Sequence, residues 1–133
     1  MVRAVVDTNV IIYDYVEDSD LHSRAEEILD SLERWVIPAV VVYEFVWFLK
    51  GMGLEKALPD VLGYLSNEKA EVACDCPENL MDAAKMVTAE SLSLSGFKDM
   101  VILSHAIRGK LPLATFDKKL TKVAKRYGVD VIQ

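Results

Sequence analysis

The chain has 133 residues, of which 52% are hydrophobic and 27% charged, and its formal net charge is -6. This length suits a single domain over 1–133, the hydrophobic fraction excludes a disordered chain, and the acidic balance argues against a general nucleic-acid coat protein. The longest apolar run is interrupted by Glu44 and ends at Lys50, which is too short for a membrane span. No signal peptide is expected, because the opening apolar run ends in an acid and no small-residue cleavage site follows.

Short apolar runs alternate with segments of helical periodicity along the chain. Strands are expected at 4–6, 36–37, 71–74, 113–116 and 129–132. Helices are expected at 9–15, 20–35, 38–52, 54–65, 77–92, 97–108 and 117–127. The second of these helices rests on the 3.6-residue spacing of apolar residues from Leu21 to Trp35, and Pro59 indicates a helix that is broken or begins there. Alternating strands and helices predict an α/β fold with a mostly parallel sheet.

Four carboxylates lie at the boundary of an apolar run or inside one. Asp7 ends the first predicted strand, Asp117 follows the fourth, and Asp99 lies in the first turn of a predicted helix. Glu44 is the only ionisable residue in the run 39–49, and no base lies one turn away on its own helix to pair with it. Ligands of parallel sheets bind at the carboxyl ends of the strands, where Asp7 and Asp117 are expected. Oxygen ligands without His or Cys suit Mg²⁺ or Mn²⁺.

Three of these acids also have an ordinary structural interpretation. Asp7 and Asp117 each precede a predicted helix and suit an N-cap, and Asp99 is a common residue at a helix start. Glu44 is the hardest to explain in this way. The conjunction of all four therefore carries the prediction of a divalent-metal site.

Five other residues are candidates for chemistry. Asn9 and Thr115 could orient a ligand or a water, although local hydrogen bonding is sufficient for each. His105 lies in an apolar helix and is interpreted as a satisfied core or interface histidine. Cys74 and Cys76 are too close in sequence to close a useful loop and lack a second ligand pair for zinc. Both cysteines are expected to be packing residues in a protein of the reducing cytoplasm.

Basic residues are concentrated near the last of the four acids. The stretch 108–126 contains seven of the 15 lysines and arginines. The helix expected over 117–127 places four apolar residues, from Leu120 to Tyr127, on one side and five bases on the other. Those bases, candidates for contact with phosphates, are Lys118, Lys119, Lys122, Lys125 and Arg126. A solvated helix face remains the alternative.

The motifs around the four acids resemble those of PIN domains, the nuclease module of VapC-type toxins in prokaryotic toxin–antitoxin pairs. The matching segments are Val-Val-Asp7-Thr-Asn, Val-Val-Tyr-Glu44-Phe-Val, Lys-Asp99-Met-Val-Ile-Leu-Ser-His-Ala and Ala-Thr115-Phe-Asp117-Lys-Lys. The resemblance covers essentially the whole chain. It implies a three-layer α/β/α sandwich and cleavage of single-stranded RNA with Mg²⁺ or Mn²⁺. It also implies a homodimer, a possible antitoxin partner, and a catalytic metal site formed by Asp7, Glu44, Asp99 and Asp117.

Two positions depart from the family pattern. Tyr43 supplies the only hydroxyl shortly before the second acid, where Ser or Thr is usual, and Lys98 precedes the third acid, where a small or apolar residue is usual. Both departures concern substrate contacts more than the metal site.

Two rival classes are weighed against a nuclease. The first is a catalytically weak PIN-like subunit that binds RNA or serves in assembly, which the presence of all four acids argues against. The second is a receiver-like signalling domain. That class needs an acid next to Asp7 and a lysine where the chain has Thr115, so it fits poorly.

Overall fold

The computed structural model describes residues 2–133, and its centre is a five-stranded, all-parallel sheet flanked by helices. The strands are β1 (Arg3–Val6), β2 (Arg34–Pro38), β3 (Ala70–Ala73), β4 (Leu113–Ala114) and β5 (Val131–Ile132). Their order in the sheet is β3-β2-β1-β4-β5, and each neighbouring pair is parallel. The predicted α/β class is confirmed.

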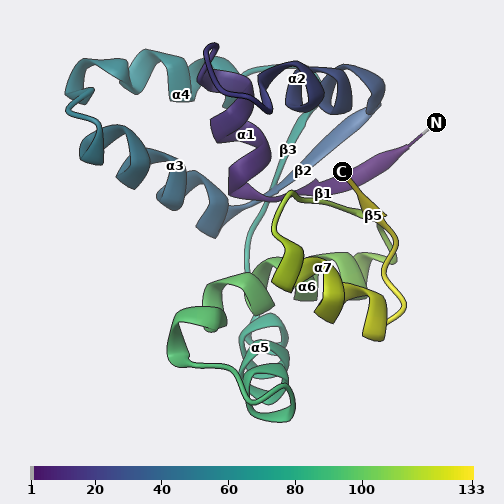
Figure 1. Cartoon of the computed structure of the whole chain (residues 1–133). Helices are drawn as coiled ribbons and strands as arrows, with labels where there is room; N and C mark the ends of the chain where they lie inside the picture. The colour runs from purple at the N-terminus through teal and green to yellow at the C-terminus, as the bar shows by residue number, and fades with distance from the viewer. Residues whose placement is uncertain (1) are drawn as a thin grey trace.

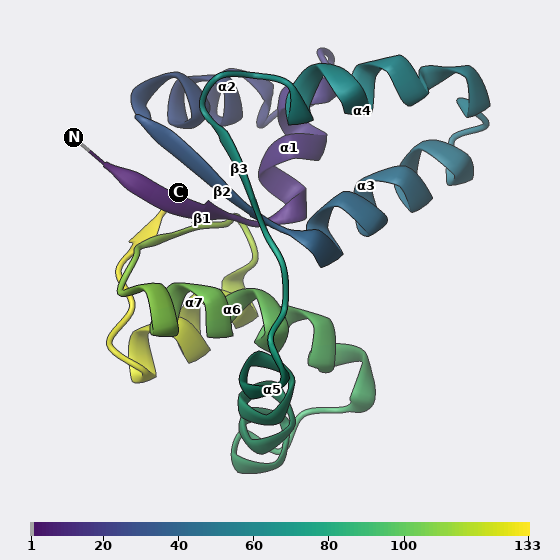
Figure 2. The ribbon, with the colours of Figure 1, turned by 180° about the vertical axis from the view of Figure 1, so that it is seen from behind.

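Helices cover both faces of the sheet. Within residues 2–133 the α-helices are α1 (Thr8–Tyr15), α2 (His22–Ser31), α3 (Ala39–Gly51), α4 (Leu58–Leu65), α5 (Pro77–Ala89), α6 (Phe97–Gly109) and α7 (Lys118–Arg126). Figures 1 and 2 show α1, α2 and α4 on one face, and α5, α6 and α7 on the other. The three layers agree with the expected sandwich. None of the helices in the described part of the chain is long and apolar enough to cross a membrane.

The core lies on both faces of the central strands, and on one of these faces it includes α6. Ala4, Val5 and Val6 of β1 are completely buried, because a central strand between two helical layers has no face in water. On α6, the run from Met100 to Leu103 is buried as well. This packing fixes the start of α6, and therefore Asp99, relative to the end of β1.

The helix predicted over 20–35 is wrong at its end. Helix α2 stops at Ser31, and Trp35 belongs to β2. The indole N–H of Trp35 donates to the carbonyl of Leu29 at 2.9 Å, and the strand pairs with both β1 and β3. Ladder hydrogen bonds to two neighbours outweigh a helical spacing of apolar residues. Pro59 lies in the first turn of α4, so that helix begins there.

Helix α3 is only partly buried, although it forms from the apolar run 39–49. Val41, Phe45 and Leu49 form its buried stripe, while Tyr43 and Trp47 are each 64% exposed. In both ribbon views, α3 and α4 extend away from the sheet as an arm (Figures 1 and 2). The exposed apolar side of this arm is a candidate interaction surface.

The cysteines are not packing residues. Cys74 and Cys76 are both free and exposed, because they lie in the connection between the edge strand β3 and α5. Nearby, His105 Nε2 lies 2.6 Å from a carboxylate oxygen of Asp75. The interpretation of His105 as a satisfied histidine is thus supported.

Candidate active site

Asp7 lies at the carboxyl end of the central strand, where the order of strands reverses between β1 and β4. Asp7 is only 5% exposed. Its carboxylate accepts two hydrogen bonds, one from the Thr8 backbone N–H and one from the Thr115 hydroxyl, each 2.7 Å long. Its own N–H donates to the carbonyl of Ala114 at 3.0 Å. Asp7 is therefore the N-cap of α1 and a link between the ends of two strands. Such a switch point is where parallel sheets bind ligands.

Asn9 and Thr115 complete this link by hydrogen bonds, of which only that between Asp117 and Thr115 is local in sequence. The Thr115 hydroxyl oxygen accepts the backbone N–H of Asp117 at 3.0 Å, and the Asn9 amide oxygen accepts that of Phe116 at 3.1 Å. These contacts hold the turn after β4 against the start of α1. Thr115 thus positions two of the predicted site residues, Asp7 and Asp117.

Asp117 is the N-cap of α7, because its carboxylate accepts the backbone N–H of Leu120 at 3.0 Å. The capping alternative is correct for Asp117 as it is for Asp7. A carboxylate has lone pairs beyond those used by a cap, so capping leaves both residues able to bind a cation.

Glu44 projects from α3 and has two partners from other elements. Its carboxylate accepts the Thr8 hydroxyl at 2.7 Å and forms an ion pair with the Lys98 ammonium at 2.7 Å. The pairing base thus comes from α6, which the search of Glu44's own helix could not reveal. Thr8 lies inside the quoted Asp-Thr-Asn motif, and Lys98 stood out as a departure from the family pattern. Neither signal identified the contact in advance.

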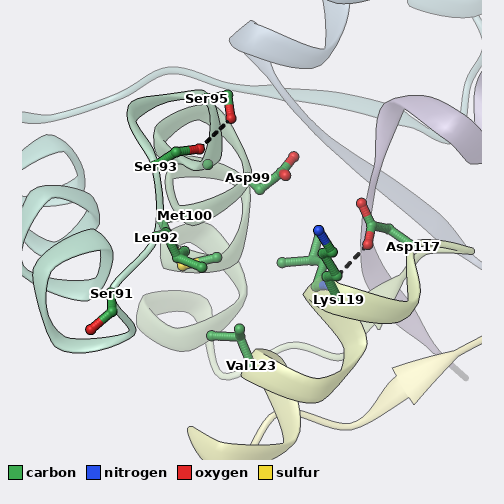
Figure 3. A pocket seen from close by; sticks show the side chains of 11 residues that line it. Ser91, Leu92, Ser93, Ser95, Asp99, Met100, Asp117, Lys119 and Val123 are labelled. Atoms are coloured by element: carbon green, nitrogen blue, oxygen red, sulfur yellow. Dashed lines mark hydrogen bonds between the residues drawn. The ribbon is translucent and has the colours of Figure 1, made fainter.

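Asp99 lies in the first turn of α6 and points toward Asp117 (Figure 3). Within residues 2–133, no protein group donates a hydrogen bond to its carboxylate. Asp99 is partly buried, so this carboxylate has lost water without gaining a donor. A cation is the partner that such a group lacks.

Burial and the charges of neighbouring acids oppose the ionisation of Asp7 and Asp99. Burial raises the pKa of Asp7 to about 7; the hydrogen bond from Thr115 opposes this, and the charges of Asp99 and Glu44 add to it. Burial also raises the pKa of Asp99 to about 6, reinforced by the charges of Asp117 and Glu44 and opposed by Lys98. Because these charges act on Asp7 and Asp99, all four predicted acids belong to one electrostatic cluster.

The oxygen atoms of these side chains are suitable ligands for a divalent cation, but their present arrangement does not form a metal site. Among the described residues, no three His, Cys, Asp or Glu side chains are arranged to hold a metal ion together. In this arrangement Asp7 and Asp117 cap helices, and Glu44 forms an ion pair. The donor set nevertheless consists of hard oxygens whose repulsion a divalent cation would relieve, as Mg²⁺ and Mn²⁺ sites require.

The five bases near Asp117 are all exposed and lie on the side of α7 away from its buried residues, as predicted. Lys118, Lys122 and Lys125 are exposed and form no ion pair within the described chain. Arg126 pairs with Glu90 at the end of α5, and Lys119, seven residues before it, lies on that same side of α7. The expected apolar side is buried except for Tyr127, which follows α7 and is 39% exposed.

A cleft adjoins the cluster, between the loop 91–96, α6 and α7 (Figure 3). It has a volume of about 380 Å³ and is lined by Ser91, Leu92, Ser93, Ser95, Gly96, Asp99, Met100, Asp117, Lys119, Leu120 and Val123. Its mouth includes two of the four acids. The alternating Ser-Leu-Ser-Leu-Ser pattern from residue 91 is the sequence feature that marks this loop, and it did not predict a cleft.

Comparison with known proteins supports the family resemblance. The family model "PIN domain" matches residues 4–126. No curated protein matches the chain.

Solved structures with this fold include three from bacteria. A toxin–antitoxin complex from Klebsiella pneumoniae has 18% identity and a TM-score of 0.70, covering 98% of this chain and 96% of that one. VapBC2 from Rickettsia felis, bound to a DNA fragment from its promoter, has 19% identity and a TM-score of 0.71, covering 99% and 98%. VapC20 of Mycobacterium tuberculosis, a toxin that cleaves the sarcin–ricin loop, has 13% identity and a TM-score of 0.79, covering 90% and 93%. At these identities the likeness establishes the fold.

Proposed function

This chain belongs to the PIN-domain family, and we propose that it is a metal-dependent endoribonuclease that cleaves single-stranded RNA. The observation that carries the proposal is the coupling of four carboxylates at one edge of the sheet, with the pKa of buried Asp7 raised to about 7. A group buried against like charges at the switch point of a parallel sheet is a recurring feature of functional sites.

We assign Asp7 and Asp99 as the central metal ligands. Glu44 and Asp117 hold a second ion or bind through water. The chemistry that Mg²⁺ or Mn²⁺ supplies when bound is the activation of a water and the stabilisation of charge on the scissile phosphate. Thr115 holds the Asp7 carboxylate in place, and Thr8 and Lys98 hold that of Glu44.

The proposal is tested with purified protein and a single-stranded RNA. Cleavage is expected with Mg²⁺ or Mn²⁺ and is expected to stop in EDTA. Asp7→Asn and Asp99→Asn are each expected to lower the rate by orders of magnitude while the circular dichroism spectrum stays unchanged, because each removes a ligand charge. An Asp7→Asn protein that cuts at the parent's rate, after removal of contaminating nuclease, contradicts the assignment.

A catalytically weak subunit that binds RNA or serves in assembly is the second candidate. The ion pair between Lys98 and Glu44 favours it, because one of the four acids is already neutralised within the chain. RNA binding without turnover in the same assay, with either metal, would favour this candidate over the nuclease.

We propose two protein partners. A second copy of the chain is one, supported by the exposed apolar side of the α3–α4 arm. An antitoxin is the other, supported by the structural likeness to a chain from a toxin–antitoxin complex. The free, exposed thiols of Cys74 and Cys76 suit a reducing cytoplasm, which is the proposed location.

A further inference from the structure

The cleft beside Asp99 and Asp117 combines three kinds of surface. Its floor includes Met100, Leu120 and Val123, whose exposed fractions are 1%, 2% and 4%. Ser93 and Ser95 lie on its rim, and their hydroxyl oxygens are 2.6 Å apart (Figure 3). An apolar floor with a few polar groups above it is the usual composition of a small-ligand site.

Lys119 places a positive charge between this cleft and the acids. Its side chain lines the cleft, whereas Lys118, Lys122 and Lys125 do not. Figure 3 shows Lys119 beside Asp117, on the opposite side of the cleft from Ser93 and Ser95. A ligand in the cleft would therefore meet Lys119 and Asp117 on one side, the hydroxyls of Ser93 and Ser95 on the other, and an apolar floor beneath.

The volume suits one unit of a polymer. About 380 Å³ lies near the lower end of the range of roughly 300–1,000 Å³ for small-molecule pockets. Single-stranded RNA presents unstacked bases that proteins hold on apolar surfaces and recognise by hydrogen bonds at the base edges. The rim hydroxyls can donate or accept such bonds.

Resting on the proposed nuclease function, we propose that the cleft is a nucleotide subsite. It takes the base of one nucleotide adjoining the scissile phosphate, with Lys119 contacting a phosphate and Ser93 and Ser95 facing the base. The subsite therefore fixes the register of the RNA at the carboxylate cluster and contributes to the choice of cleavage position.

The test is a titration of the protein, in EDTA, with each of the four nucleoside 5′-monophosphates. Two-dimensional NMR of the ¹⁵N-labelled parent is expected to show chemical-shift changes in the amides of residues 92–96 and 119–123, with α3 unaffected. Inorganic phosphate alone is expected to leave residues 92–96 unchanged. Ser95→Trp, which places a large ring in the cleft mouth, is expected to abolish the chemical-shift changes that nucleotides cause.

A matched pair of variants tests the role of Lys119 and remains informative if Ser95→Trp does not fold. Lys119→Ala is expected to weaken the nucleotide affinity severalfold, and Lys85→Ala, which removes an exposed lysine of α5 outside the cleft lining, is expected to leave it unchanged. Absence of shift changes with all four nucleotides overturns the proposal. So does equal weakening by both lysine variants, or an undiminished response in folded Ser95→Trp.

These outcomes are separable from those of the nuclease assay. If the protein cuts RNA but no nucleotide shifts residues 92–96, the subsite is wrong and the proposed function stands. If nucleotides bind in the cleft and no RNA is cut with either metal, the subsite stands and the nuclease proposal fails.

Discussion

Asp7 and Asp99 are held in surroundings that oppose their ionisation. Their pKa values are raised from 3.8 to about 7 and about 6, so folding favours the protonated forms. A carboxyl group whose folded pKa exceeds its unfolded value does not change the free energy of unfolding below the unfolded pKa. As pH rises from there through the folded pKa, the group destabilises the fold progressively. For Asp7 the full effect is on the order of 4 kcal/mol. Without metal, the site therefore contributes a loss of stability between about pH 4 and pH 7.

Replacing Asp99 by Asn is expected to stabilise the metal-free protein. The change removes a poorly solvated charge and its repulsion, and no hydrogen bond to Asp99 is lost among the described residues. In EDTA, the melting temperature is expected to rise above the parent's at about pH 8 and to match it at about pH 4, where the parent's carboxyl groups are largely protonated. Mn²⁺ is expected to stabilise the parent at about pH 8 and the variant much less.

The control for this change is Asp130→Asn, which neutralises an exposed acid outside the cluster. It is expected to leave both the melting temperature and the response to Mn²⁺ unchanged. An Asp99→Asn protein that melts below the parent in EDTA, together with a parent indifferent to Mn²⁺, contradicts the four-carboxylate site. In that case Asp99 is only a residue that favours the start of α6.

Lys98 is expected to act as a counter-ion for Glu44. Lys98→Met removes the ammonium that lies 2.7 Å from the Glu44 carboxylate, so repulsion among the acids increases. Lys98 is 54% exposed, so the destabilisation in EDTA is expected to stay below about 1 kcal/mol. Melts with and without Mn²⁺ are expected to show a larger metal-induced gain than in the parent. Lys98→Arg keeps the charge and is the control; a smaller gain in Lys98→Met than in Lys98→Arg counts against the counter-ion role.

At the scale of elements, α7 offers exposed lysines that no acid neutralises within residues 2–133. Replacing Lys118, Lys122 and Lys125 by Glu is expected to weaken the binding of RNA whatever its sequence. Each contact between a lysine and a phosphate releases counter-ions, and the variant loses these contacts. The slope of log affinity against log salt is expected to flatten by about 2, at roughly 0.7 per contact for a single strand. Fluorescence anisotropy in EDTA measures this slope. An unchanged slope means that these lysines form a solvated face.

Arg126 gives the matched comparison on the same helix. It already pairs with Glu90, so Arg126→Ala is expected to change the salt slope less than Lys122→Ala does. Equal changes from the two variants would show that the ion pair opens when RNA binds.

The elements that could be predicted are those whose pattern is local. The apolar run from Ala4 to Val6 indicates a buried strand, and the structure buries it completely. Trp35 was misplaced because its side chain continues a helical spacing, while the hydrogen bonds that make it a strand residue come from β1 and β3. Pairing with distant strands leaves no trace in the spacing of a single segment.

The candidate site was predictable in its members and not in its contacts. Motif spacing identified Asp7 and Glu44. The strand topology explains why the two residues lie near the same edge of the sheet, because each follows one of two neighbouring parallel strands. The ion pair of Glu44 joins residues 54 positions apart in sequence. It depends on how α3 and α6 cross the edge of the sheet, so only a three-dimensional arrangement reveals it. The same holds for Lys119, which differs from its neighbouring lysines only by facing the cleft.

For the whole molecule, the main unexplained surface is the α3–α4 arm. Tyr43, Val46 and Trp47 are exposed on α3, and Leu58 and Leu62 are exposed on α4. Lys50 lies over the Trp47 ring, 4.5 Å from its centroid. An exposed apolar surface of this kind is typical of an interface, and large aromatic residues usually contribute most of the binding energy there. The arm also carries Glu44, so a partner on the arm would lie close to the carboxylate cluster.

The last prediction is that two copies of the chain associate through this arm. Light scattering after gel filtration is expected to give the mass of a dimer at micromolar concentration. Trp47→Glu is expected to give a monomer, because burying an unpaired carboxylate at the centre of an interface costs more than the roughly 2 kcal/mol of a typical hot spot. The variant protomer is expected to stay folded, since position 47 is 64% exposed and the new carboxylate can pair with Lys50 one turn away. Tyr127→Glu, at an exposed aromatic beyond α7, is the control and is expected to remain dimeric. A parent that is monomeric at every concentration, or a Trp47→Glu protein that stays dimeric, rejects the arm as the dimer interface.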